Sequence, residues 1–114
     1  MSVTAAEFRR LALGFPDTVE GSHMGHADFR VGGKIFATLP SEGHGMVKLS
    51  PADQASFVDP ETGVFMPAKG GWGRHGSTIV KLNAVNKSAL KDALKKAWLN
   101  TAPKRIVQKA NPIS

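Results

Sequence analysis

The feature that most constrains the fold is the segment HADFRVGGKIFATL at residues 26–39, in which two β-rich runs flank Gly32 and Gly33. Paired glycines tolerate the positive φ angles of a tight turn, so the segment predicts a β-hairpin of antiparallel strands. The long βαβ crossovers that a parallel sheet needs have no counterpart in the rest of the chain. The sequence therefore favours an antiparallel sheet over a doubly wound parallel one.

Amphipathic helices are predicted near both ends of the chain. A capping box of Thr4 and Glu7 begins the first helix. Asn86 caps the last helix, and Pro103 ends or kinks it. The apolar positions of this last helix follow helical spacing and predict a face that packs on the core: Leu90, Ala93, Leu94, Ala97 and Trp98.

Shorter elements fill the middle of the chain. Strands are predicted at 45–50, 63–67 and 77–82, and a short helix with proline at its first position is predicted over 51–59. Together these elements predict an α+β fold. We expect a two-layer sandwich in which the N- and C-terminal helices lie on one face of an antiparallel sheet.

Positive charge is concentrated in the last third of the chain. The formal net charge is +6, and residues 81–114 hold eight Lys or Arg against one acidic residue. Such asymmetry favours an anionic partner, and a solvated lysine face is the alternative reading of the same composition. The chain length fits a single domain, expected over residues 1–105 and followed by a basic, flexible tail over residues 106–114.

Composition also narrows the location and the chemistry. The chain has no cysteine, which excludes disulfides and thiolate metal sites. Its N-terminal apolar run is interrupted by charges, unlike a signal peptide, and no apolar stretch has the length of a membrane span. We expect a cytoplasmic protein that has no membrane contact and is monomeric.

The segment GWGRHG at residues 71–76 matches the G-x-G-x-x-G pattern of dinucleotide-binding loops. That fingerprint lies between a strand and a helix, whereas here the β-branched run STIVKL follows it. The glycines instead predict a surface turn or bulge that presents Trp72, Arg74 and His75. Trp72 and Arg74 then either contact a nucleic acid, or Trp72 packs over the sheet edge while Arg74 stays solvated.

The spacing of histidines and carboxylates gives no metal or catalytic motif. His23 and His26 form H-x-x-H with Asp28 beyond. An odd separation places their side chains on opposite faces of an extended strand, whereas a bend at Gly25 would bring them together. Ser22 beside His23 does not indicate a triad, because a nucleophile and its base meet through the fold. The sequence therefore predicts no metal, no cofactor and no catalytic residue, and we expect a non-enzymatic protein.

Four segments of the chain carry a combined signature: GHADFRVGGKIFATL, MVKLSPADQ, GGWGRHGSTIVKLNAV and ALKKAWLNTAPKR. Together they resemble the MmcQ/YjbR family of small bacterial proteins, and the likeness extends from Phe8 to about Arg105. The resemblance implies a compact α+β fold similar to that of the bacterial frataxin homologue. It also implies DNA binding, and it supplies no catalytic residues.

The leading hypothesis is a DNA-binding module that contacts phosphates with little sequence readout. Trp72 is predicted to stack or wedge, and the predicted phosphate contacts are Arg30, Lys34, Lys69, Arg74, Lys104, Arg105 and Lys109. The alternative is a pocket for a small molecule or an acidic protein, lined by His23, His26, Trp72 and His75. The first hypothesis predicts steeply salt-dependent binding on a convex or grooved surface, and the second predicts salt-resistant binding in a concave site.

Overall fold

The computed structural model describes residues 3–110, which form a six-stranded sheet with helices around it. Along the chain the elements are α1 (Ala5–Leu13), β1 (Thr18–His23), β2 (His26–Val31), β3 (Lys34–Ser41), β4 (His44–Lys48), α2 (Pro51–Phe57), β5 (Phe65–Pro67), α3 (Gly70–Arg74), β6 (Ser77–Lys81), α4 (Lys87–Thr101) and α5 (Lys104–Ala110). The strands pair in the order β1-β2-β3-β4-β6-β5, and every neighbouring pair is antiparallel. The predicted α+β fold with an antiparallel sheet is confirmed.

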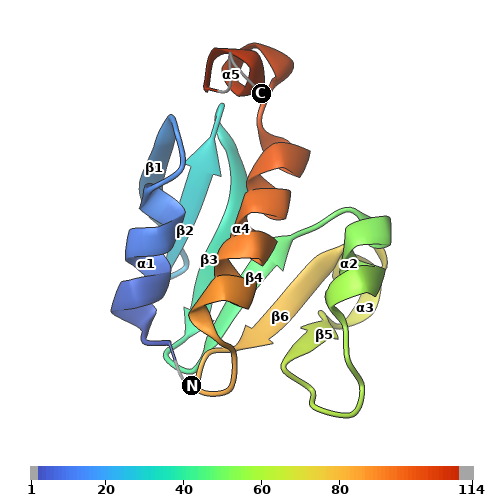
Figure 1. Cartoon of the computed structure of the whole chain (residues 1–114). Coiled ribbons are helices and arrows are strands. Elements are labelled where there is room, and N and C mark those ends of the chain that lie inside the picture. Colours follow the sequence, from blue (N-terminus) through green and yellow to red (C-terminus); the bar gives the residue numbers. More distant parts are fainter. Residues whose placement is uncertain (1–2, 111–114) are drawn as a thin grey trace.

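Helices α1 and α4 cover one face of the sheet, as Figure 1 shows, and the main core lies beneath them. Phe8 of α1 packs on Phe29 of β2 with ring centroids 5.9 Å apart. The apolar stripe predicted for the last helix is buried along its whole length, from Leu90 to Trp98. The predicted placement of the N- and C-terminal helices on one face is therefore confirmed.

Trp98 packs the C-terminal end of α4 against the core. Only 4% of its surface is exposed. Its indole stacks on Phe15 with centroids 6.2 Å apart, and its Nε1–H donates to the carbonyl of Pro16 at 3.1 Å. A buried indole that stacks and satisfies its single donor stabilises a core strongly. The packing role predicted for Trp98 is confirmed.

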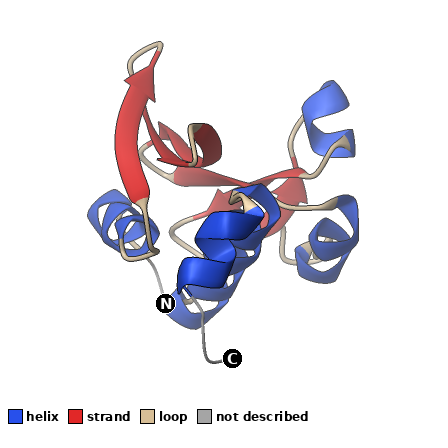
Figure 2. Cartoon of the chain, turned by 90° about the horizontal axis from the view of Figure 1, so that it is seen from above, coloured by secondary structure: helices blue, strands red, loops and turns tan. Residues whose placement is uncertain are grey.

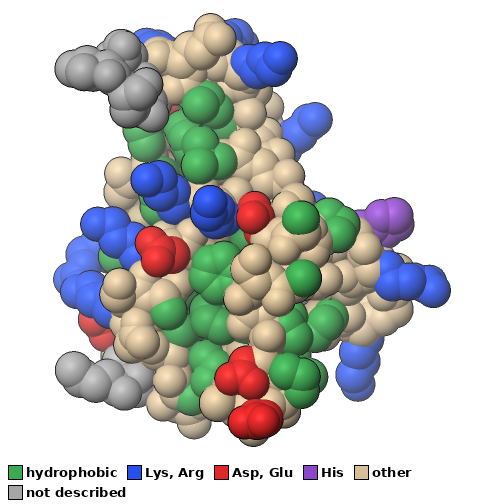
Figure 3. Space-filling view, turned by 45° about the vertical axis from the view of Figure 1, so that its right-hand side comes forward, with side chains coloured by type: hydrophobic (Ala, Val, Ile, Leu, Met, Phe, Trp, Pro, Cys, Tyr) green, Lys and Arg blue, Asp and Glu red, His purple; other side chains and the backbone are tan. Residues whose placement is uncertain are grey.

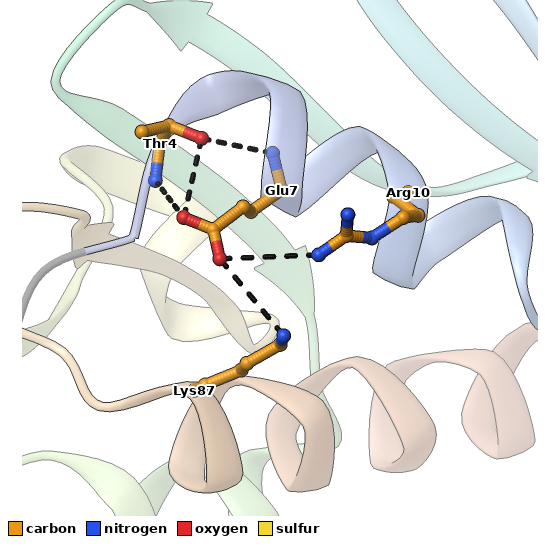
Figure 4. Close-up of polar contacts among 4 residues, drawn as sticks. All are labelled: Thr4, Glu7, Arg10 and Lys87. Atoms are coloured by element: carbon orange, nitrogen blue, oxygen red, sulfur yellow. Dashed lines mark hydrogen bonds and ion pairs between the residues drawn. The ribbon is translucent and has the colours of Figure 1, made fainter.

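Glu7 ties the start of α1 to the start of α4 (Figure 4). Its carboxylate accepts from the backbone N–H of Thr4 at 3.2 Å, which completes the predicted capping box. The other carboxylate oxygen lies 3.9 Å from both Arg10 and Lys87. The backbone hydrogen bond from Thr4 is the main cause that lowers the pKa of Glu7. Glu7 thus joins the starts of the two covering helices through an exposed ion pair with Lys87.

The other face of the sheet is not covered by α1 or α4. Figure 2, seen from above, shows the β1–β2 hairpin curving out of the sheet on the side away from α4, with α3 on that same side. The hairpin and α3 flank the part of this face where side chains of the central strands and α3 line a concave surface, which we call the trough. None of the helices within residues 3–110 has the length and apolar character needed to cross a membrane.

The structure contains three elements that the sequence did not predict, of which two, β1 and α3, belong to the sheet and its open face and the third is α5. The first is β1, whose sequence TVEGSH lacks clear alternation but which pairs with β2 along its whole length. The second is α3, where the expected turn or bulge is a single helical turn. A side chain at Gly73 would collide with the carbonyl oxygen of Ala68, and one at Gly76 would collide with that of Leu49. The glycines there permit close backbone approach, which fixes α3 against its neighbours.

Residues 104–110 form α5, where the sequence analysis expects a domain boundary at residue 105 and a flexible tail from residue 106. Ile106 is 7% exposed and belongs to the core. Gly32, in the β2–β3 turn, lies so close to Pro103 that a side chain at this glycine would overlap the proline ring. Packing of Ile106 and Pro103 on the hairpin turn therefore orders a stretch whose composition alone favours a tail. Residues 111–114 lie outside the described residues.

Candidate functional site

A row of cross-strand partners crosses the open face of the sheet. Partners in adjacent strands project to the same side, and here they are Gly21, Asp28, Thr38, Met46, Ile79 and Met66. The register shift between Phe29 and Arg30 places Arg30 opposite Ile35. As a result polar and apolar side chains of the central strands form the floor of the trough.

Two adjoining grooves lie along this trough, and the first also reaches the last turn of α4 through Asn100 and Thr101. The first, which we call the basic groove, has a volume of about 620 Å³ and is lined by Arg30, Gly33, Lys34, Ile35, Lys48, Leu49, Trp72, His75, Ser77, Asn100 and Thr101. The second, which we call the apolar groove, has a volume of about 450 Å³ and is lined by His23, Ile35, Thr38, Pro40, Met46, Lys48, Ala68, Lys69 and Trp72. The grooves share Ile35, Lys48 and Trp72, so they form one continuous concave surface.

Trp72 lies where the two grooves meet. It is 69% exposed, which is unusual for so large an aromatic side chain. The Nζ atom of Lys48 lies 5.9 Å from the centre of its ring, at the limit of a cation–π contact. The α3 backbone below it is held by Gln54, whose Nε2 donates to the carbonyl of Gly73 at 2.9 Å. A fixed helical turn therefore presents an aromatic face to solvent.

A buried carboxylate underlies one wall of the trough. Asp28 has no exposed surface, and it accepts from Arg30 through two bonds, at 2.8 and 3.0 Å. Nδ1 of His23 lies 2.7 Å from the same carboxylate. The hydrogen bond from Arg30 is the main cause that lowers the pKa of Asp28, and burial acts against it. Asp28 is therefore ionised at neutral pH, and Arg30 balances its charge.

This cluster changes what Arg30 and His23 offer to a ligand. Asp28 occupies two of the five N–H donors of the Arg30 guanidinium and compensates its charge. Because an ionised carboxylate can only accept hydrogen bonds, Nδ1 of His23 carries the proton. In the neutral imidazole, Nε2 is then an acceptor, and His23 lines the apolar groove. A side chain at Gly21 would lie 2.9 Å from Asp28 Oδ1, so this glycine leaves room for the cluster.

The residues of both sequence hypotheses converge on this face. Of the predicted phosphate contacts, Arg30, Lys34 and Lys69 line the grooves, and so does Trp72, the residue predicted to stack or wedge. Of the predicted pocket residues, His23 lines the apolar groove and His75 lines the basic groove, beside Trp72. The sequence treats the two sets as alternatives, and the fold brings half of the first set and three of the four pocket residues into one trough.

Other predicted residues lie elsewhere. Arg74, at the end of α3, is exposed and lines neither groove. His26 lines a separate shallow depression with Arg9. Of the two alternatives for His23 and His26, the structure has the bend at Gly25: a turn separates the two histidines and makes them cross-strand partners. Within residues 3–110 no three His, Asp or Glu side chains gather as metal ligands.

The remaining predicted cations belong to α5: Lys104, Arg105 and Lys109. This helix packs by the β2–β3 turn and none of the three lines either groove. Sequence reasoning missed Lys48, which lines both grooves. The signal that could have found it is strand alternation, since Lys48 shares a face with Met46, two residues before it.

The helix-covered side of the molecule differs in charge pattern. Figure 3 looks toward that side and shows Lys and Arg side chains dispersed among acidic and hydrophobic ones. Three lysines at four-residue spacing on α4 are exposed, away from the buried stripe of this helix: Lys87, Lys91 and Lys95. The densest run of lysine in the sequence is thus separate from the grooves.

Comparison with known proteins places the chain in a family. A model of the YjbR family matches residues 13–100. The fold is similar to the crystal structure of a Deinococcus radiodurans protein with the domain DUF419, with a TM-score of 0.71 and 14% identity over 100% of this chain and 83% of that one. A comparison with curated proteins found no match. Since the family match spans most of the sequence, this chain belongs to the YjbR family.

Proposed function

We propose that this protein binds DNA across the open face of the sheet, and that it prefers a single strand. The observation that carries the proposal is Trp72, an exposed aromatic side chain on a fixed helical turn between two grooves with cationic rims. Proteins that bind single strands combine basic grooves, which follow the phosphates, with aromatic side chains on which bases stack. The trough contains both parts.

The cations in the trough suit phosphate contact without sequence readout. Lys34, Lys48 and Lys69 line the grooves, and the structure gives none of these three an ion pair within residues 3–110. Lysine contacts phosphate as a point charge, which positions a strand but does not distinguish bases. Arg30 contributes less because Asp28 already binds it. We therefore assign most of the affinity to the three lysines and to stacking on Trp72.

The concave shape favours an unpaired strand over a duplex. Stacking on Trp72 needs a free base face, which paired bases inside a duplex do not offer. The hairpin and α3 rise on either side of the floor, which limits contact with a rigid cylinder (Figure 2). A flexible single strand can enter the trough and place successive phosphates along its rim.

A second candidate is a binding site for a small molecule. The apolar groove supports it, because its volume of about 450 Å³ falls in the range of small-molecule sites and most of its lining is apolar. This candidate predicts binding that varies little with salt, since apolar contacts are not screened. The same protein surface would then serve a discrete ligand and not a polymer.

The test is fluorescence anisotropy with labelled single-stranded and duplex DNA at about 50 and about 200 mM salt, the range over which phosphate-driven affinity falls steeply. We expect tighter binding to the single strand, weakening with salt, and a loss of about five- to 100-fold for Trp72→Ala, as stacking on one base predicts. Trp72→Phe is the control that keeps an aromatic face, and heparin controls for polyanion binding. Equal affinity of wild type and Trp72→Ala, or tighter duplex binding, would contradict the proposal.

A further inference from the structure

In its neutral form His23 presents a hydrogen-bond acceptor, Nε2, in a groove whose lysines are donors only. Its Nδ1 is engaged by Asp28 at 2.7 Å, and 46% of its side chain is exposed. It lines the apolar groove together with Lys48 and Lys69, whose ammonium groups only donate. A phosphate needs donors, so an acceptor in this position serves a different part of a ligand. That part must carry an N–H or O–H group.

The rest of the apolar groove indicates the shape of that part. Its walls include Ile35, Pro40, Met46 and Trp72. Met46 belongs to the row of cross-strand partners on the floor, and Trp72 is the exposed aromatic of α3. An apolar lining that includes an aromatic ring and a methionine suits a planar ring, because rings pack against aromatic and thioether groups. Lysines at the groove suit an anion attached to that ring.

From these features we propose that the apolar groove holds one unpaired nucleobase and that His23 Nε2 accepts a hydrogen bond from an N–H group on the base edge. His23 is then a specificity-determining residue, which distinguishes bases by the donors they present. The inference rests on the proposed function, and it adds base reading to a surface whose lysines read only phosphate. The shared chemistry is a base with an N–H donor plus a phosphate, whether in a free nucleotide or in a strand.

The buried cluster explains how His23 can hold this role. Asp28 fixes the ring orientation, and Arg30 neutralises the carboxylate through its two bonds. Without Arg30 a buried negative charge beside the groove would repel a phosphate. Gly21 allows the three side chains to meet, because a larger residue there would overlap Asp28. A fixed imidazole loses little conformational freedom on binding, which strengthens the discrimination it gives.

The test is an NMR titration of the whole protein with deoxyadenosine monophosphate, its N6,N6-dimethyl analogue and deoxyribose 5-phosphate. We expect the indole signal of Trp72 to shift with both nucleotides and not with the sugar phosphate, while the buried Trp98 serves as an internal reference. We expect deoxyadenosine monophosphate to bind about three- to tenfold more tightly than the dimethyl analogue, the value of one hydrogen bond. His23→Ala should remove this ratio, and His26→Ala should preserve it.

Three results would overturn the inference: equal affinity for the two nucleotides, equal affinity for the sugar phosphate, or a ratio that survives in His23→Ala. The comparison of ligands uses the wild-type protein, so it stands even where a variant folds poorly. Anisotropy with single strands that contain adenine or dimethyladenine separates the two proposals. Strand binding without discrimination overturns the base pocket alone. Discrimination between free nucleotides without strand binding overturns the proposed function and leaves a nucleotide site.

Discussion

The two faces of the sheet use the same strands in opposite ways. Phe29 of β2 and Val47 of β4 are fully buried on the face beneath the helices. Their immediate neighbours Arg30 and Lys48 lie on the open face, partly exposed, and line the basic groove. Alternation of side chains along a strand allows one backbone to supply a core and a binding surface together. Phe29 and Val47 therefore contribute to stability, whereas Arg30 and Lys48 are available for ligand contact under the proposed function.

The two tryptophans show the same contrast. Trp98 is 4% exposed and packs beneath the helices, whereas Trp72 is 69% exposed on the open face. Trp98 has a stacked aromatic partner and a carbonyl for its indole N–H. The Nζ atom of Lys48 lies 5.9 Å from the centre of the Trp72 ring. The exposure of Trp72 beside the two grooves supports the proposed binding surface on the open face.

The largest expected effect compares how much the two tryptophans contribute to the free energy of unfolding. Trp98→Ala removes a buried indole, its stacking and its hydrogen bond, so we expect a loss of about 3–5 kcal/mol in the free energy of unfolding. Trp72→Ala removes little buried area, and we expect a change within about 0.5 kcal/mol. Urea unfolding followed by circular dichroism measures both. Similar losses for the two variants would show that Trp72 belongs to the fold and not to a binding surface.

The helix-covered face could be predicted from the sequence because its signals are local. The hairpin turn at Gly32, the capping box and the stripe ending at Trp98 each depend on neighbouring residues, and all three occur in the structure. The open face depends on pairings between distant segments. Lys48 and Trp72 share a groove only because β4 and α3 flank the same part of the sheet. Nothing in either segment indicates the other.

The buried cluster of Asp28, Arg30 and His23 could be predicted only in part from the sequence. Strand alternation places Asp28 and Arg30, two residues apart, on one face. His23 joins them through the β1–β2 turn, and the sequence of β1 gives too weak a pattern to predict that strand. The α5 helix was not predicted because it also depends on contacts between distant segments. Burial of Ile106 against the hairpin outweighs a composition typical of a flexible tail. Tertiary contacts decided both cases.

The next prediction concerns Asp28, the buried carboxylate beneath the open face. We expect Asp28→Asn to lower the free energy of unfolding by about 1–3 kcal/mol at neutral pH, because Arg30 and His23 lose a charged acceptor. The pKa of Asp28 is lowered in the folded state, so its contribution is present above the unfolded-state pKa of about 3.9 and is lost as pH falls through the folded value.

Urea unfolding of wild type and Asp28→Asn from pH 7 to pH 2.5 measures this contribution. The two stabilities should converge as pH falls through the lowered pKa of folded Asp28, because the protonated carboxyl resembles the amide. Asp53→Asn is the control, because that carboxyl lies near the start of α2, away from the cluster. A constant difference at every pH would mean that Asp28 acts through shape and not through charge.

A smaller effect separates the lysines of the two faces. Lys48→Ala and Lys69→Ala should each reduce the slope of log affinity against log salt by about 0.7 for a single strand, since each removes one phosphate contact. Lys91→Ala and Lys95→Ala, on α4, should leave the slope unchanged. Anisotropy at four or more salt concentrations gives the slopes. Equal reductions from both pairs would indicate diffuse attraction by net charge, with no defined trough.

The smallest expected effect is that of Arg74→Ala. This variant tests how far the proposed binding surface extends around α3. Arg74 belongs to the same helical turn as Trp72 but lines neither groove. Its charge can act on a bound strand only through solvent, where screening weakens attraction within about 8–10 Å. We expect less than a twofold loss of single-strand affinity, measured by anisotropy beside Trp72→Ala. A tenfold loss would extend the binding surface around α3, because a solvated guanidinium that matters so much must contact the strand directly.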